Sequence, residues 1–301
     1  MLSKLESIEQ SIGKLAQNQN ALQKSIRRNG EINMLKNSQI AQKSLFCQIQ
    51  NCINTPPLIK DFGFRVFSQF DEDGIIMYLF AVVGFTNKYC LDIAFFNPIG
   101  ANTTNLLLNW AFGGLLICGE EKDKLISQDF FKSDYNTRHV PPKIINNWVT
   151  AENIKDILSQ NKVPKEIDFF SLDIDGVDYY ILQEVLKVIQ PRVVVVEAHN
   201  VWGAEKSVTV RYSADFNRFN IHKDYCGASI PAFIKIMKAN KYKLVACNKY
   251  GFNIFFIKEN IDRGNLPEIK AEDCFANLPN YYIEELDKRR KEVEHLDWIE
   301  V

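Results

Sequence analysis

The first part of the chain carries apolar side chains at a helical spacing. Steps of three and four residues separate these positions, as in the seam of a coiled coil, and they are Leu5, Ile8, Ile12, Leu15, Leu22 and Ile26. Gln19 fills the remaining slot of the series, and a polar residue at a seam can fix register at a cost in stability. Gly30 interrupts the pattern, and a second helical stretch is predicted toward Gln48.

Two interpretations of residues 1–55 remain open at this stage. The segment is either an amphipathic helix packed on its own domain or a parallel coiled coil that joins copies of the chain into a homo-oligomer. The stretch from Asn54 to Pro57 ends it, because proline cannot continue a helix. We therefore divide the chain into a helical coiled-coil arm (1–55), a central domain (60–262) and a C-terminal tail (263–301).

Between residues 60 and 262, short apolar runs alternate with helical patterns. The apolar runs predict strands at 88–95, 114–118, 144–149, 168–174, 192–197, 243–247 and 251–258. The helical patterns cover 71–83, 103–111, 151–160, 179–188 and 229–240, with Thr150 as the expected cap of the third helix. This alternation predicts an α/β, Rossmann-like sheet that a hairpin closes, with ligands at the carboxyl ends of its strands. The tail is expected to end in one amphipathic helix between 277 and 301.

Composition narrows the classes of partner. The net charge of the 301 residues is −1, and residues 1–55 carry +4, which leaves −5 for the remainder. No strong field therefore favours nucleic acid or a membrane surface. The seven cysteines are scattered, which is typical of a reducing cytoplasm, and they form no zinc pattern. We expect no signal peptide and no transmembrane segment, because the longest apolar run, 75–85, is too short to span a bilayer.

Acidic residues crowd the end of the fourth expected strand. Asp173, Asp175 and Asp178 flank Gly176, and carboxylates so close require a cation, hydrogen-bond donors or raised pKa values. Glu197 and His199 follow the next strand and are expected at the same edge of the sheet.

Two kinds of chemistry suit these residues. His199 could take the proton of a hydroxyl group, and Asp173, Asp175 and Glu197 could bind Mg²⁺ or Mn²⁺, because hard cations prefer oxygen ligands. Solvated acids around a helix cap, and a histidine with a structural role, are the alternatives.

The turn after the first expected strand is poor in glycine. A nucleoside cofactor needs glycine there for close approach of the backbone, but residues 94–102 contain only Gly100. An acid after the second strand would hold the ribose hydroxyls. Cys118 occupies that place, and Glu120 is the nearest substitute.

Five segments occur in an order that resembles a known family. They are Ser-Gln-Phe-Asp-Glu-Asp-Gly-Ile (68–75), Val-Thr-Ala-Glu-Asn-Ile (149–154), Leu-Asp-Ile-Asp-Gly-Val-Asp-Tyr (172–179), Arg-Val-Val-Val-Val-Glu (192–197) and Tyr-Cys-Gly-Ala-Ser (225–229). Together they resemble the bacterial FkbM-like methyltransferases, especially the branch of surface-glycan biosynthesis, over residues 65–260. The resemblance implies a class I methyltransferase sheet, S-adenosyl-L-methionine (SAM) as cofactor, and a sugar or glycan hydroxyl as acceptor in capsule or lipooligosaccharide assembly.

The chain departs from the family in the half that binds the cofactor. The family turn reads acid-x-Gly-x-x-Asp-Gly, and Asp92 keeps the acid while Ala94 and Pro98 replace the glycines and Asn97 replaces the aspartate. The resemblance implies cofactor contacts by Asp92, Ala94, Asn97, Asn102, Glu120 and Asp173, and catalytic roles for Asp175 and His199. A family member that no longer methylates, and that serves as an oligomeric scaffold or binding subunit, is the alternative.

Overall fold

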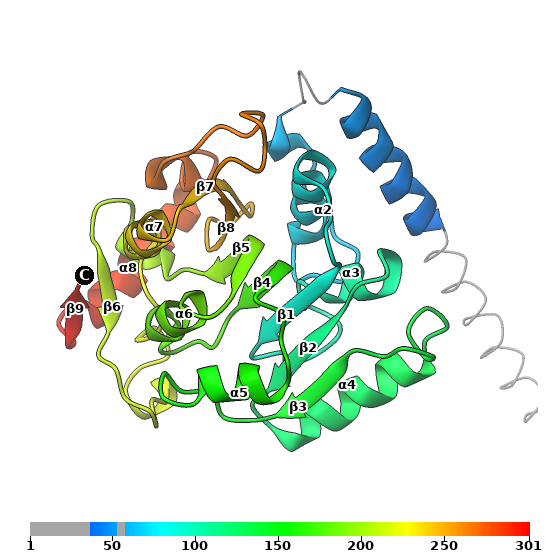
Figure 1. The fold of residues 1–301 in the computed structure, drawn as a ribbon. Coiled ribbons are helices and arrows are strands. Elements are labelled where there is room, and N and C mark those ends of the chain that lie inside the picture. Colours follow the sequence, from blue (N-terminus) through cyan, green and yellow to red (C-terminus); the bar gives the residue numbers. More distant parts are fainter. Residues whose placement is uncertain (1–36, 53–57) are drawn as a thin grey trace, which may run out of the picture. The chain divides into compact units, whose positions relative to one another are not determined.

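The computed structural model describes residues 37–52 and 58–301 (Figure 1). The expected coiled-coil seam from Leu5 to Ile26 lies outside the described residues. Residues 37–51 form one helix, and the account below concerns residues 58–301. Among the described residues, no helix is both long and apolar enough to cross a membrane.

A seven-stranded sheet forms the centre of this part, in the order β3-β2-β1-β4-β5-β8-β7. The strands are β1 (Tyr89–Ile93), β2 (Gly113–Cys118), β3 (Lys143–Asn146), β4 (Glu166–Leu172), β5 (Gln190–Glu197), β7 (Tyr242–Cys247) and β8 (Asn253–Lys258). Strands β1 to β5 pair in parallel, and β8 lies antiparallel between β5 and β7. The predicted Rossmann-like sheet with a closing hairpin is therefore confirmed. Its strand order reverses between β1 and β4, where ligands bind in such sheets.

Helices cover both faces of the sheet (Figure 1). They are α2 (Glu72–Val83), α3 (Thr104–Asn109), α4 (Glu121–Ser133), α5 (Ile154–Gln160), α6 (Asp178–Leu186), α7 (Ile230–Ala239) and α8 (Asn280–Val293). Buried side chains of α5, α6 and α7 pack with Phe170 and Leu172 of β4. On the other face, Phe169 contacts Phe80 of α2, with ring centroids 6.2 Å apart. Parallel strands need apolar side chains on both faces, which explains why the strand segments read as continuous apolar runs.

The acids of the segment 68–75 stabilise the fold. The Asp73 carboxylate is fully buried and accepts hydrogen bonds from the backbone N–H groups of residues 66–68, at 2.6 to 2.8 Å. Glu72 is also buried and accepts from the side-chain amides of Asn248 and Asn253, both at 2.9 Å. The Asp73 bonds fix the segment before α2, and the Glu72 bonds tie the start of α2 to the hairpin of β7 and β8, so this part of the family-like pattern is structural.

Three local features differ from the expectation. Helix α4 was not predicted, because only Asp123, Ser127 and Phe131 are buried in a strongly charged segment. Thr150 does not directly precede α5, although its Oγ1 accepts from the N–H of Asn153 at 3.3 Å. The cap is Asn153, whose Oδ1 accepts from the N–H of Thr150 at 2.8 Å, so residues 151–153 form a turn before the helix begins. The tail is not one helix to its end, because strand β9 (Trp298–Glu300) follows α8 and pairs with β6 (Val208–Val210).

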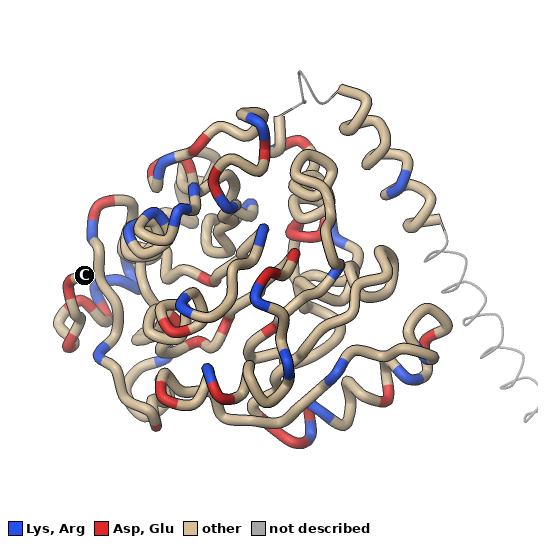
Figure 2. Tube along the Cα trace, viewed as in Figure 1, with Lys and Arg blue, Asp and Glu red and all other residues tan. Residues whose placement is uncertain are grey.

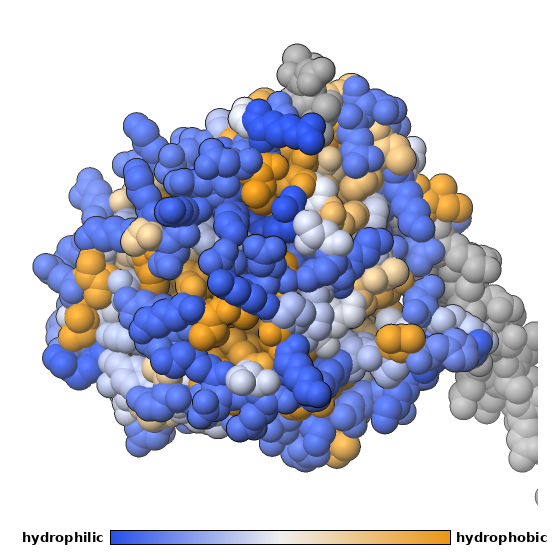
Figure 3. Space-filling view, in the orientation of Figure 1, coloured by the Kyte–Doolittle hydropathy of each residue, from blue (hydrophilic) through white to orange (hydrophobic). Residues whose placement is uncertain are grey.

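Charges are distributed evenly over the described residues. Figure 2 shows Lys and Arg interspersed with Asp and Glu along the chain. On the face that Figure 3 shows, hydrophilic groups dominate and separate the apolar ones. The arrangement agrees with the near-neutral net charge of the sequence.

Candidate active site at the carboxyl ends of β4 and β5

A cavity of about 160 Å³ lies beyond the carboxyl ends of β4 and β5. Its volume is close to that of a cavity that holds a benzene ring, about 150 Å³. Its acidic, imidazole and guanidinium lining residues are Asp175, Asp178, Glu197, His199, Arg218 and Arg289. The structure therefore brings Asp175, Glu197 and His199 to one site, at the edge where the sequence predicts them.

Three carboxylates form a compact cluster at this edge. Asp173, Asp175 and Glu197 each offer an oxygen, and these atoms lie within 4.8 Å of one another. Asp175 has a φ of +58°, in the left-handed region that is unusual for residues other than glycine. Such conformations cluster at functional sites, where the surrounding structure holds them. The turn that carries Asp175 thus places its carboxyl group beside that of Glu197.

Two carboxyl groups of the cluster, those of Asp175 and Glu197, keep their protons more readily than usual. Burial raises the pKa of Glu197 well above its ordinary value, and the charge of Asp173 and a hydrogen bond with its carboxyl group add to this effect. Burial and the Asp173 charge likewise raise the pKa of Asp175 to about 6, although the Arg218 guanidinium opposes them. Without a cation, the cluster is therefore partly protonated near neutral pH.

Asp178 has a different role from its neighbours. Its carboxylate accepts hydrogen bonds from the backbone N–H groups of Ile174, at 2.7 Å, and Gly176, at 2.9 Å. Burial still raises its pKa to about 7. Because both of its oxygens are committed to the turn, Asp178 fixes the loop that presents Asp175.

His199 is buried, with 8% of its surface exposed, and its Nε2 atom has no hydrogen-bond partner among the residues that the structure describes. The ring donates a hydrogen bond to the backbone of Asp224. Burial and the charge of Arg289 lower the pKa of His199 to about 4, so the imidazole is neutral at pH 7. With the proton on Nδ1, Nε2 carries a lone pair, and that atom belongs to a residue lining the cavity. A neutral imidazole with a free lone pair can accept a proton, and the lowered pKa makes His199 a weaker base than an ordinary histidine.

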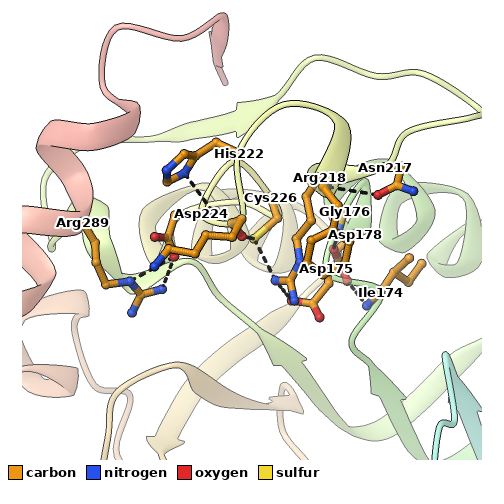
Figure 4. A network of polar contacts seen from close by, with 12 residues as sticks. Ile174, Asp175, Gly176, Asp178, Asn217, Arg218, His222, Asp224, Cys226 and Arg289 are labelled. Atoms are coloured by element: carbon orange, nitrogen blue, oxygen red, sulfur yellow. Dashed lines mark hydrogen bonds and ion pairs between the residues drawn. The ribbon is translucent and has the colours of Figure 1, made fainter.

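Two arginines complete the polar lining (Figure 4). Arg218 Nη1 donates to Asp175 and to Sγ of Cys226, the latter at 3.6 Å. Arg289 donates through Nε and Nη2 to Oδ1 of Asp224, at 3.0 and 2.6 Å. No sequence pattern points to either arginine, because neither lies at a strand end and only the fold brings η3 (Arg218–Asn220) and α8 to this edge.

The expected cofactor residues lie at the neighbouring strand ends. Asp92 of β1 is buried and accepts a hydrogen bond from Oγ1 of Thr103, at 2.6 Å. Burial raises its pKa to about 7, and the Asp173 charge contributes. Asn102 is buried and donates to Oγ of Ser171, at 3.2 Å, while its Oδ1 has no partner within residues 37–52 and 58–301. An acceptor atom is thus available between β1 and β4.

The turn after β1 keeps a backbone conformation that glycine favours. Ala94 has a φ of +69°, which costs energy for a residue with a Cβ atom. Asn97 is exposed, and its Oδ1 accepts from the N–H of Ile99 at 2.9 Å. Cys118 at the end of β2 is fully buried, whereas Glu120, the residue before α4, is exposed. Glu120 is therefore accessible to a ligand, and Cys118 is not.

A family model matches part of the chain. Residues 129–244 match the family model of the methyltransferase FkbM domain. The matched segment includes Asp173, Asp175, Glu197, His199 and Arg218, and it leaves out the turn after β1. No curated protein sequence matches the chain.

Solved structures with a similar fold include several methyltransferases. One is an O-methyltransferase from Bacillus cereus in complex with SAH, with 12% identity, 72% of this chain and 89% of that chain covered, and a TM-score of 0.41. Another is a putative O-methyltransferase from Klebsiella pneumoniae, with 11% identity, 71% and 89% covered, and a TM-score of 0.40. A SAM-dependent methyltransferase from Methanosarcina mazei has 10% identity, 56% and 92% covered, and a TM-score of 0.34.

Proposed function

We propose that the protein is a SAM-dependent O-methyltransferase that acts on a sugar or glycan hydroxyl. The observation that carries the proposal is the buried, neutral His199, whose Nε2 atom has no partner beside a carboxylate cluster at the ligand-binding edge of the sheet. The FkbM match over the same residues supports the reaction class.

The residues at the ends of β1 and β2 suit the cofactor. The positive φ of Ala94 preserves the backbone path of a glycine turn, and the unpartnered Oδ1 of Asn102 is available for a hydrogen bond. In the proposed complex, Asp92, Ala94, Asn97, Asn102 and Asp173 hold SAM, and Glu120 takes the ribose hydroxyls. Bound SAM supplies an electrophilic methyl group.

The carboxylate cluster suits a divalent cation. Asp173, Asp175 and Glu197 offer three oxygen ligands within 4.8 Å of one another, and Mg²⁺ and Mn²⁺ prefer such ligands. A cation there favours the deprotonated carboxylates and so reverses the raised pKa values of Asp175 and Glu197. We propose that the cluster, loaded with the cation, orients the hydroxyl of the acceptor.

His199 is the proposed general base. Nε2 accepts the proton of the acceptor hydroxyl, and the hydrogen bond from the ring to the backbone of Asp224 keeps the lone pair on that atom. The remainder of catalysis is alignment, because in-line displacement depends on the relative position of the hydroxyl and the methyl group. The cavity walls therefore contribute by fixing the acceptor.

The wider setting follows from the family resemblance. We propose that the acceptor belongs to capsule or lipooligosaccharide assembly, that the reaction takes place in the cytoplasm, and that residues 1–55 join copies of the chain into a homo-oligomer. The seam of apolar positions between Leu5 and Ile26 supports the last point.

Transfer of a labelled methyl group tests the proposal. The full-length protein is incubated with methyl-tritiated SAM, Mg²⁺ and capsule or lipooligosaccharide precursors, and the products are examined for tritium and for added methyl groups by mass spectrometry. We expect transfer by the wild type and by His295→Gln, since His295 is an exposed histidine of the tail. Absence of transfer to every precursor would favour the non-methylating scaffold instead.

A further inference from the structure

Arg218 and Arg289 flank the proposed general base from two separate segments. Both guanidinium groups line the cavity, and both are close enough to His199 for their charges to lower its pKa. Arg218 is paired with Asp175 of the carboxylate cluster and Arg289 is paired with Asp224, and neither lies at the cofactor turn. From their position, we expect the two arginines to bind a part of the acceptor other than the reacting hydroxyl.

Arg289 is held rigidly and keeps a free edge. Its Nε and Nη2 donate to a single oxygen, Oδ1 of Asp224, and the side chain of Asp224 is only 6% exposed. Within the described chain, no hydrogen bond is formed by Nη1 of Arg289. A guanidinium fixed in this way can bind a ligand without losing further side-chain freedom.

Arg218 also has an unused donor. Its Nη1 contacts Asp175, whereas its Nε is buried and has no hydrogen-bond partner among the described residues. A buried N–H group without a partner costs free energy, and an oxygen of a ligand would remove that cost. His199 Nε2 is the second unpartnered buried atom on this lining, which indicates that a polar ligand belongs here.

The chemistry of these donors favours an anion. Guanidinium groups bind phosphate and carboxylate oxygens through paired, charge-assisted hydrogen bonds. In the free protein, Asp175 and Asp224 balance the two arginine charges. A cation at the carboxylate cluster would draw Asp175 toward itself and would leave Arg218 free for the ligand. Phe252 and Tyr282 also line the cavity and provide aromatic surface for a sugar ring.

Building on the proposed function, we propose that the acceptor carries an anionic group, phosphate or carboxylate, which Arg218 and Arg289 bind while a neighbouring hydroxyl faces His199. The acceptor class is thus a sugar phosphate or a uronic acid rather than a neutral sugar.

Calorimetric titration without SAM tests this inference independently of methyl transfer. The full-length protein with Mg²⁺ is titrated with glucose 1-phosphate, glucuronate and glucose as probes. We expect at least one of the two anionic probes to bind at least tenfold more tightly than glucose, and the difference between those two identifies the anionic group. Equal affinity for all three, or no binding of either anionic probe at millimolar concentration, would overturn the inference.

Variants of the two arginines test whether the anionic probe binds at these side chains. Arg218→Gln and Arg289→Gln should each weaken binding of the anionic probe by about ten- to a hundredfold, the loss of one charge-assisted hydrogen bond. Arg290→Gln is the matched control, because the neighbouring Arg290 pairs with Asp287 at 2.9 Å and does not line the cavity. Since Arg289→Gln leaves a buried Asp224 carboxylate unpaired, Arg289→Lys is measured as well, with thermal melts of each variant.

The outcomes separate the two proposals. Unchanged affinity in folded Arg218→Gln and Arg289→Lys would contradict the anionic subsite. If the anionic probe binds through these arginines but SAM does not bind, the subsite stands and the proposed function fails. If SAM binds and neither anionic probe does, the anionic subsite is contradicted, and the proposed function is not.

Discussion

The indole ring of Trp298 stacks on the imidazole of His199, with ring centroids 5.9 Å apart and planes 11° from parallel. Trp298 belongs to β9, and its Nε1 donates to the carbonyl of Val293 at 2.9 Å. Tyr225 fixes the same segment, because its hydroxyl donates to the carbonyl of Asp297 at 2.6 Å. The C-terminal segment therefore forms part of the site and sets the plane of the histidine.

Trp298→Ala should impair the reaction through the position of His199. We expect kcat to fall by about tenfold to a hundredfold, as small displacements of a reacting group do. We also expect the pKa of His199, followed by NMR, to rise from about 4 toward its ordinary value, because the cavity left by the indole admits water. Trp298→Phe keeps an aromatic face, so its kcat and the pKa of its His199 should lie close to those of the wild type. A fall in kcat with an unshifted pKa would argue against positioning.

His199→Gln should abolish most of the activity and preserve the fold. Loss of a general base costs about 10²- to 10⁴-fold in turnover, and we expect kcat to fall within this range. Asp175→Asn should reduce kcat by about two orders of magnitude or more, because it removes one ligand of the proposed cation. The measurement is release of S-adenosylhomocysteine in the presence of acceptor, with His295→Gln as control. Wild-type turnover in His199→Gln would remove the histidine from the mechanism.

Asp173→Asn should have opposite effects with and without a cation. The charge of Asp173 raises the pKa values of Asp92, Asp175, Asp178 and Glu197, so without cation its removal relieves repulsion and should raise Tm. Millimolar Mg²⁺ or Mn²⁺ should raise the Tm of the wild type by mass action and leave the variant almost unchanged.

A matched variant controls for general effects of charge. Asp156→Asn, at an exposed position of α5, should respond to Mg²⁺ as the wild type does. Equal stabilisation of all three proteins by the cation would show that it binds elsewhere.

Asp92 should make the stability of the protein depend on pH. Its pKa is raised from 3.8 to about 7 in the folded chain, so the stability due to its bound proton is complete below about pH 4 and is lost as the pH rises through 7. Asp92→Asn cannot lose this proton. We expect the Tm of the variant, relative to that of the wild type, to increase between pH 4 and pH 8 in the absence of ligands. A constant difference over this range would show that Asp92 is already ionised.

The sequence predicted the sheet well because its strands are buried on both faces. Runs such as Val193 to Val196 are apolar throughout, and this pattern does not depend on distant residues. Helix α4 was missed because its buried positions include Asp123 and Ser127, which look like surface residues in isolation. The end of the tail was misread because β9 is defined by its pairing with β6, about ninety residues earlier in the chain.

The site also combines residues that local sequence can place with residues that only the folded chain brings together. Asp175, Glu197 and His199 could be placed together because parallel strands end at one edge of a sheet. Arg218, Arg289 and Trp298 could not be placed in this way. Arg218 and Arg289 reach the cavity from η3 and α8, and Trp298 stacks on His199 from β9, so only the folded chain brings these elements to the sheet edge. Local sequence carries no information on such packing.

Calorimetric titration of the full-length protein with SAM and S-adenosylhomocysteine, with and without Mg²⁺, tests the central claim most directly. The account predicts micromolar binding of both ligands, weakened in Asn102→Ala, because the unpartnered Oδ1 of Asn102 and the turn at Ala94 form the proposed cofactor site. No binding at millimolar ligand would contradict it. The Rossmann-like sheet would then serve another purpose, and the partners of residues 1–55 would become the question.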